Sequence, residues 1–340
     1  EDGITIIGYE GGIGEYYDYS ENYAEVYIEG SGSTIRTYGG NIDISAINSV
    51  TKDITADNIG DSEWLGSYDD DSTNYALVNI SDTLDTRSDD GYGEGAIDIS
   101  ATNTVDTDLT VNEDIGDYDD DSENYAEINL GTDDGDGNIY ADSDVTLIAT
   151  NTVNVSVSAD YISDFEDDYE NYAKINIGSV YYYGYNYYEG NGYISAGSGD
   201  VTLTAENNVV RDVNVTDLGD YEDDESENYA EVNMGGYGYN YSYGYYPIYG
   251  TIYTDTGDVT LTAENSLTKN FTSDYIGDYE DDESENYAEI NLGGYWWGGS
   301  NGSINTGSGD VTLTADNSAT RTIDAGYIES YEDDSDDNAA

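Results

Sequence analysis

Apolar and polar residues alternate strictly along two short phrases that return throughout this 340-residue chain. In the stretch 285–292, Glu-Asn-Tyr-Ala-Glu-Ile-Asn-Leu, the apolar residues Ala288, Ile290 and Leu292 share one parity. The stretch 259–265, Val-Thr-Leu-Thr-Ala-Glu-Asn, alternates in the same way. Because successive strand residues point to opposite faces, this period of two predicts β-strands. Neither phrase has the apolar spacing of three and four that is typical of a helix.

Both phrases recur at a nearly constant interval. The second phrase begins at residues 42, 97, 145, 201, 259 and 311. The first follows an acidic run, and its asparagines stand 52, 50, 47, 57 and 58 residues apart, at Asn22, Asn74, Asn124, Asn171, Asn228 and Asn286. A degenerate seventh copy occupies 337–340. Such repetition predicts an all-β, right-handed parallel β-solenoid of about six repeats of ~50–58 residues, with 1–340 forming one continuous domain.

The number of coils per repeat is a separate question. A repeat of ~50–58 residues is long for one coil, so we expect two coils per repeat, and one very wide coil is the alternative. Stacked coils lie about 4.8 Å apart, as strands do in any sheet. Two coils per repeat would then give the whole chain an axial length of about 60 Å.

Alternation also assigns a direction to the asparagines. Asn265 shares parity with Val259 and Ala263, and Asn286 shares parity with Ala288, so both should point into the solenoid. Inward asparagines at one corner stack as ladders in which each amide bonds the copies above and below. We therefore predict two amide ladders, one through the Asn286 series and one through Asn48, Asn103, Asn151, Asn207, Asn265 and Asn317.

The acidic composition limits the partners. The chain has 75 acidic and 7 basic residues and a formal charge of −68, which repels nucleic acid and anionic membranes. Low hydropathy with such charge is typical of disorder, but the strict alternation and the single proline, Pro247, favour a folded chain. A compact state then requires cations or salt to reduce the repulsion.

Other absences narrow the chemistry further. The chain has neither cysteine nor histidine, which removes disulfides, Cys/His zinc sites and thiol or imidazole catalysis. No apolar run approaches the ~20 residues that a membrane helix needs, so we expect no membrane insertion. The sequence opens on Glu1 rather than methionine, and we expect a processed, secreted chain located outside the cell or on its surface.

The acidic runs are candidate metal sites. Stacking would place them over one another as a column of carboxylates, which should recruit hard cations. Calcium suits such a column because it accepts six to eight oxygens in flexible geometry. The alternative is a solvated acidic face with diffuse cations, since no run matches an EF-hand or the glycine-rich calcium repeat. The candidate ligands are Asp117, Asp119, Asp120, Asp121, Glu123, Asp164, Glu166, Asp167, Asp168, Asp220, Glu222, Asp223, Asp224, Asp278, Glu280, Asp281 and Asp282.

Tyrosine- and glycine-rich segments interrupt the strand phrases at one place in each repeat. The chain has 39 tyrosines against two phenylalanines, concentrated in 181–188 and 237–249, and 295–297 holds Tyr-Trp-Trp at the matching place. Tyrosine offers a large amphipathic contact surface at low entropy cost. We expect these loops to bulge from one side and to serve adhesion or subunit packing. The alternative is that they cover the apolar edge of their own solenoid.

The phrases together resemble a known family. Gly-Asp-Val-Thr-Leu-Thr-Ala-Glu-Asn at 199–207 and Asn-Tyr-Ala-Glu-Ile-Asn-Leu at 286–292 resemble the large repetitive exoproteins related to filamentous haemagglutinin. The resemblance extends from about residue 20 to 320 and implies a secreted, right-handed β-helical adhesin or surface fibre. The chain departs from that family in its dense acidic loops and its tyrosine-rich loops, and the family's secretion domain is not visible at the N-terminus.

Three functions are compatible with these patterns. The apolar strand 4–7 has no preceding acidic loop and no polar cap, so we expect head-to-tail self-association into an extracellular filament, with cell-surface or glycan targets. The alternative is a calcium-loaded matrix or mineral-binding protein. An enzyme of the polysaccharide-lyase kind is disfavoured, because its catalysis needs one singular site, whereas here the acidic groups recur and the basic residues are spread over the repeats.

Overall fold

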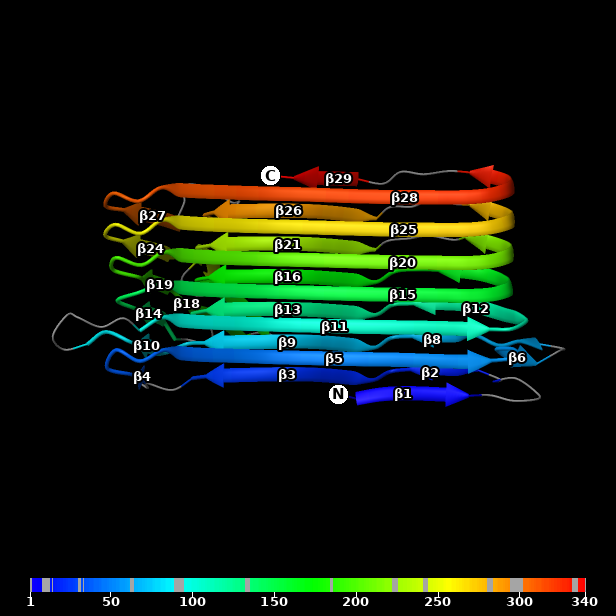
Figure 1. Ribbon diagram of the computed structural model, residues 1–340, viewed down its shortest axis with the longest axis horizontal. Coiled ribbons are helices and arrows are strands. Elements are labelled where there is room, and N and C mark those ends of the chain that lie inside the picture. The colour runs from blue at the N-terminus through cyan, green and yellow to red at the C-terminus, as the bar shows by residue number, and fades with distance from the viewer. Residues whose placement is uncertain are drawn as a thin grey trace.

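The computed structural model describes residues 2–7, 13, 15–29, 32, 34–61, 64–88, 95–131, 135–183, 186–221, 226–240, 244–279, 284–293, 302–331 and 336–339. Strands account for nearly all regular structure in these ranges, and stacked parallel strands form three sheets, here called A, B and C (Figure 1). The fold is a parallel β-solenoid, consistent with the right-handed form, as the period of two predicted. The described residues include no helix long and apolar enough to cross a membrane.

Sheet A is formed by the second phrase. Its strands stack in the order β1 (Asp2–Ile7), β5 (Ile42–Ala56), β11 (Ile97–Val111), β15 (Val145–Glu166), β20 (Val201–Tyr221), β25 (Val259–Tyr279) and β28 (Val311–Tyr331). At one end the chain bends, and β2 (Tyr16–Asp18), β8 (Tyr68–Asp70) and β12 (Asp114–Asp120) continue the same sheet below the bent end of β15.

Sheets B and C carry the remaining strands of each coil. Sheet B is built from the Asn-Tyr-Ala phrase, in β3 (Glu21–Ile28), β9 (Thr73–Ile80), β13 (Glu123–Leu130), β16 (Glu170–Ile177), β21 (Glu227–Met234), β26 (Glu285–Leu292) and β29 (Asp336–Ala339). Sheet C contains β4 (Thr34–Arg36), β10 (Thr83–Asp85), β14 (Gly137–Tyr140), β19 (Gly192–Ser195), β24 (Gly250–Thr254) and β27 (Gly302–Thr306).

The strand register corrects the predicted number of coils. Ile97 of β11 lies beside Ile42 below and Val145 above, so one step up the stack uses one whole repeat of the sequence. The expectation of two coils per repeat is therefore wrong, and the alternative, one very wide coil per repeat, is correct. Much of the repeat lies in its long sheet A strand, which reaches 22 residues in β15. The axial estimate of about 60 Å falls to about half.

Three short antiparallel pairs accompany the three parallel sheets. Strands β17 (Ser179–Tyr183) and β18 (Asn186–Gly190) form one hairpin, and β22 (Gly236–Asn240) and β23 (Gly244–Ile248) form another. These hairpins are the predicted tyrosine-rich loops at 181–188 and 237–249, whose contacts with other molecules remain a prediction. The matching segment 295–297 lies outside the described residues. A smaller pair joins β6 (Gly60–Asp61) and β7 (Trp64–Leu65).

The core lies between the sheets, where parity predicted it. Val259, Leu261 and Ala263 of β25 are completely buried. Val259 and Leu261 form one cluster with equivalent positions in the other internal coils and with inward residues of sheets B and C, and Ala263 packs in a smaller cluster with Ala230 and Ala288. A second cluster fills the bent end of sheet A and contains Leu267 and Phe271. One coil therefore buries little by itself, and its apolar residues are covered by the coils above and below.

The predicted asparagine ladder of sheet A is complete, and that of sheet B is present from Asn22 to Asn228. In sheet A each amide Nδ2 from Asn48 to Asn265 donates to the Oδ1 of the next copy at 2.9 Å. In sheet B the bonds from Asn22 to Asn228 measure 3.0–3.1 Å. The predicted ladder stops there, because the buried side-chain amide of Asn286 makes no hydrogen bond to Asn228. The two ladders also connect the sheets, since Asn103 Nδ2 donates to the backbone carbonyl of Asn74. Amide stacking therefore joins successive coils and satisfies polar groups at the corner.

Candidate functional surfaces

Inside the bent end of sheet A, an aromatic column is followed by a column of aspartates. Tyr16, Tyr68, Tyr118, Phe165 and Tyr221 stack with ring centroids 4.5–5.6 Å apart. Alternation turns the residue two positions later to the same side, so four buried aspartates follow the first four rings: Asp18, Asp70, Asp120 and Asp167. Carboxylates in such a place need cations, because burial of an uncompensated charge is costly.

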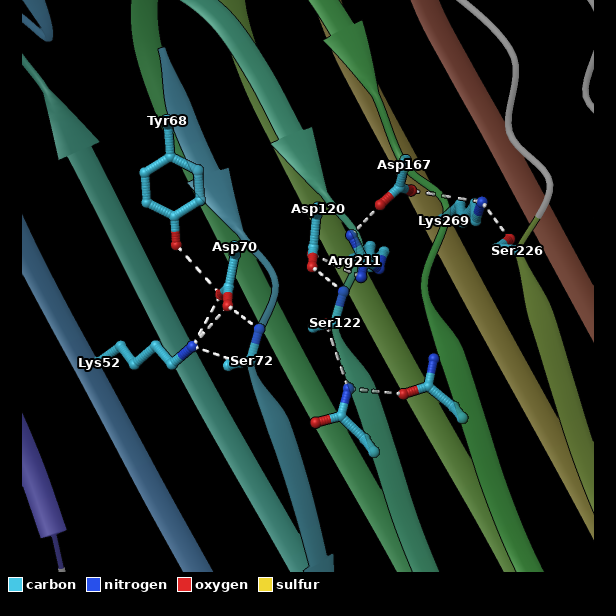
Figure 2. A network of polar contacts seen from close by, with 12 residues as sticks. Lys52, Tyr68, Asp70, Ser72, Asp120, Ser122, Asp167, Arg211, Ser226 and Lys269 are labelled. Carbon is cyan, nitrogen blue, oxygen red and sulfur yellow. Dashed lines mark hydrogen bonds and ion pairs between the residues drawn. The ribbon is translucent and has the colours of Figure 1, made fainter. Parts of the chain in front are cut away.

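Buried cations from the opposite strands supply that compensation in the lower coils. Lys52 Nζ lies 2.7 Å from both Asp18 Oδ2 and Asp70 Oδ2, and it donates to Ser72 Oγ at 2.7 Å. Burial alone would lower the pKa of Lys52, but the two carboxylates raise it above its usual value. The residue therefore stays charged inside the solenoid, and its contacts with Asp70 and Ser72 appear in the left part of Figure 2.

Arg211 plays the same role higher in the stack. Its Nη2 lies 2.7 Å from Asp120 Oδ2, and its Nη1 donates to Asp167 (Figure 2). Lys269 Nζ is 3.4 Å from the second oxygen of Asp167 and 3.2 Å from Ser226 Oγ. Burial would raise the pKa of Asp120, but the guanidinium and a hydrogen bond from Ser122 hold it below its ordinary value. Asp120 is thus ionised and closely paired with Arg211, whereas burial raises the pKa of Asp70 despite its pair with Lys52.

Sequence reasoning missed this network, although parity carried the signal for its cations. Lys269 lies between Leu267 and Phe271 in the alternation, and the strand register aligns it with Arg211 and Arg321. In the coils below Arg211, the same column is occupied by Val155, Thr107 and Lys52. One interior column therefore contains cations in the lower and upper coils and uncharged residues between them.

The predicted metal ligands separate into three groups. Asp120 and Asp167 lie inside with Arg211 and do not belong to an outer column. Nine others are partly or fully exposed: Asp117, Asp119, Asp121, Glu123, Asp164, Glu166, Asp168, Asp220 and Asp278. Glu222, Asp223, Asp224, Glu280, Asp281 and Asp282 lie outside the described residues. Within the described ranges, no three acidic side chains are close enough together to form a preformed metal site.

The outer carboxylates at the acidic corner nevertheless repel one another. Strand pairing aligns Asp119 with Asp69 below and Glu166 above. Partial burial and then the charge of Glu166 raise the pKa of Asp119 to about 6. Partial burial and then the charge of Asp119 raise the pKa of Asp121 to about 7. The described part of this corner therefore holds negative charge at neutral pH at a cost in free energy.

The outer face of sheet B combines tyrosines with glutamates. Tyr125, Tyr172, Tyr229 and Tyr287 stack with ring centroids 5.0–5.2 Å apart. Each hydroxyl of the first three donates to a glutamate of the coil above, with distances of 2.7 Å from Tyr125 to Glu170 and 2.6 Å from Tyr229 to Glu285. Burial, followed by this hydrogen bond, raises the pKa of Tyr125 and Tyr229.

Four residues after these tyrosines, a third asparagine ladder runs up the same face. Asn79, Asn129, Asn176, Asn233 and Asn291 bond in succession at 2.8–3.0 Å. The sequence gives this series the outward parity, and its repetition was the signal that could have identified the ladder. Glutamates between the two columns accept from it, as Glu231 does from Asn233 at 2.9 Å. The outer face is therefore held in a regular arrangement.

Comparison with protein-family models, with curated proteins and with solved structures finds no match to this chain.

Proposed function

We propose that this chain is a non-catalytic structural subunit, a secreted β-solenoid that stacks head to tail into an adhesive extracellular fibre. The observation that carries the proposal is the uniform interface between coils. Asparagine meets asparagine and tyrosine meets tyrosine from one level to the next. A coil of a second copy therefore offers the same partners as a coil of the same chain. Contacts repeated in this head-to-tail sense generate an open filament rather than a closed ring.

The upper edge of the described stack fits this function. Val311 and Leu313 of β28 are 46% and 47% exposed, whereas their equivalents one coil below, Val259 and Leu261, are completely buried. The edge of β28 extends over 21 residues. Long uncovered edges with apolar inward positions favour pairing with another strand. A first coil from a second copy would cover them in the register that the internal coils already use.

The regular distribution of charged groups supports a non-catalytic role. The described acidic residues recur at the same position of successive coils, and the cations Lys52, Arg211 and Lys269 are buried in ion pairs. General acid–base catalysis instead needs a singular group within reach of a substrate. A structural array uses its polar groups between coils, which is how the ladders use theirs.

Electron microscopy of negatively stained protein tests the proposal. The unmodified chain should form fibres about as wide as one coil. The double variant Val311→Lys with Leu313→Lys places charge on the inward positions of the upper edge and should abolish the fibres. Thr312→Lys with Thr314→Lys, on the opposite face of the same strand, is the matched control and should leave them intact.

The circular dichroism spectrum of both variants should retain the β signal of the unmodified chain, because each changes only the last long strand. Deletion of residues 1–8 should likewise remove fibres and leave the monomer folded. Monomers from the unmodified chain at every concentration, or fibres from the Val311→Lys, Leu313→Lys variant, would contradict head-to-tail stacking.

A second function, cation binding by an acidic matrix protein, is favoured by the raised pKa values of Asp119 and Asp121. Carboxylates that repel one another gain most from a divalent cation, and calcium accepts the flexible oxygen geometry of such columns. At low ionic strength, calcium should raise the melting temperature and a chelator should reverse the increase. A melting temperature that responds equally to sodium and calcium at matched ionic strength would indicate diffuse screening instead.

A further inference from the structure

The outer face of sheet B contains one described lysine, and the surroundings of that lysine indicate what else the face can bind. Lys174 Nζ lies 4.0 Å from the ring centroid of Tyr172 and 5.8 Å from that of Tyr229. The same nitrogen lies 3.8 Å from Glu231 Oε2 in the coil above. An ammonium beside tyrosine rings and a carboxylate gains both cation–π and ionic attraction.

The other coils repeat these surroundings without the lysine. Strand register places Glu25, Leu77, Glu127, Glu231 and Glu289 in the column of Lys174. Tyrosines occupy the position two residues earlier in every one of these coils. Against the single ammonium, the described face presents nine carboxylates in two columns: Glu21, Glu123, Glu170, Glu227 and Glu285, and Glu25, Glu127, Glu231 and Glu289.

We propose that this tyrosine–glutamate face binds an extended, lysine-rich segment of a partner protein, whose ammonium groups take the place in other coils that Lys174 takes in its own. Charge complementarity selects the partner, because nine carboxylates and one ammonium leave the face strongly negative. A second copy of this chain does not fit, since it has only seven basic residues and Lys52, Arg211 and Lys269 are buried.

The spacing of the coils suits a segment that crosses them. Coils repeat about every 4.8 Å, and residues on one side of an extended strand repeat about every 6.7 Å. The difference of about 1.9 Å per step accumulates along the segment, and the flexible four-carbon stem of lysine can absorb it over two or three neighbouring lysines. The compact ammonium does not require the fixed fork geometry of arginine. The ordered tyrosines and glutamates need little rearrangement on binding, which reduces the entropic cost of the complex.

Fluorescence anisotropy with a labelled (Lys-Ser)5 peptide at physiological salt tests the proposal on the full chain. Glu231→Gln with Glu289→Gln removes two charges from the face while keeping side-chain shape, and should raise the dissociation constant at least fivefold. The matched control, Glu206→Gln with Glu264→Gln, removes two exposed charges from the outer face of sheet A and should change it less than twofold. A (Glu-Ser)5 peptide should not bind.

Lys174→Gln provides an independent test, because it should strengthen peptide binding rather than weaken it. It vacates the place beside Tyr172 and Glu231, so the peptide should bind about twofold to threefold more tightly. Arg87→Gln makes the same charge change at an exposed side chain outside sheet B and is the matched control, which should bind the peptide less tightly than Lys174→Gln does. Circular dichroism confirms that each variant is folded. Equal weakening by the two double variants would show non-specific attraction to an acidic protein and overturn the proposed face, as would an unchanged dissociation constant in Lys174→Gln.

Discussion

Replacement of Arg211 by methionine is the most direct test of the interior ion network. The arginine is 1% exposed, its Nη2 lies 2.7 Å from Asp120 Oδ2, and its Nη1 donates to Asp167. Its guanidinium carbon also lies 3.4 Å from the ring centroid of Tyr169. Methionine occupies a similar volume without charge, so the variant leaves two buried carboxylates with one cation fewer. Loss of one partner from a buried pair costs about 3–5 kcal/mol, which is the expected loss in free energy of unfolding.

A double-mutant cycle separates the charge effect from packing. Asp120→Asn removes one of the two buried charges that Arg211 neutralises, so Arg211→Met with Asp120→Asn should be more stable than the sum of the single variants predicts. The expected coupling energy is about 1–3 kcal/mol, measured by urea unfolding at constant salt. A loss below about 1 kcal/mol in Arg211→Met, or additive effects, would refute the network as described.

The effect of Arg211→Met on stability should also depend on pH in a predictable direction. The pKa of Asp120 is lowered in the folded chain, so its pair contributes fully above the ordinary aspartate value of about 3.9 and is lost as the pH falls through the lowered value. Without Arg211 the pKa of Asp120 should instead rise above about 3.9 on folding. The free energy of unfolding that Arg211→Met loses relative to the unmodified chain should therefore be largest near neutral pH and smaller near pH 3. An equal loss in free energy of unfolding at neutral pH and at pH 3 would refute the ion pair between Asp120 and Arg211.

Three further predictions test other parts of the stack. Asn151→Ala breaks one ladder and leaves buried amide groups unpaired, and should cost about 3 kcal/mol in urea titrations, whereas Thr152→Ala beside it should cost less than about 0.5 kcal/mol. Gly257→Ala would place a Cβ 1.8 Å from the carbonyl oxygen one coil below and should cost at least about 2 kcal/mol; Gly40→Ala, with its nearest neighbour at 3.6 Å, is the control and should be neutral. Asp121→Asn should raise the melting temperature near pH 8 and have little effect near pH 4, because a carboxyl with a raised pKa destabilises the folded chain only at pH values that ionise it. Comparable shifts at both pH values would argue against charge repulsion at that corner.

Alternation in the sequence predicted the faces of the strands and both inward ladders, because each phrase contains enough apolar residues to fix its parity. Val259 and Ala263 determine the direction of Asn265, and the structure buries all three. The number of coils could not be obtained in the same way. A period gives the residues in a repeat, but it does not say whether the chain folds back once or twice within it. A single strand of 21 residues, β25, uses the length that two short strands would have used.

The acidic runs were harder to interpret because alternation is invisible where every residue is a carboxylate. In 119–121, Asp-Asp-Asp, only the flanking residues of inward parity, Tyr118 and Asn124, indicate which side chain turns inward, and they select Asp120. The candidate ligands therefore contained two residues of an interior network together with residues of the outer corner. Lys52, Arg211 and Lys269 could have corrected this, since a buried cation in an acidic chain requires an inward carboxylate nearby.

Burial of these cations has a consequence for the outer surface. Each cation that neutralises an interior aspartate is withdrawn from the exterior, so the outer carboxylates depend on solution ions or on partners for relief. Salt should distinguish the exposed outer carboxylates from the buried ion pairs. Screening acts strongly between exposed groups and weakly between buried ones, and the Debye length falls from about 30 Å at 0.01 M to about 3 Å at 1 M. The stabilisation from Asp121→Asn should therefore shrink across that range, while the deficit of Arg211→Met persists. If both effects decreased together, Arg211 would have to be exposed to solvent in the folded chain, contrary to its observed burial.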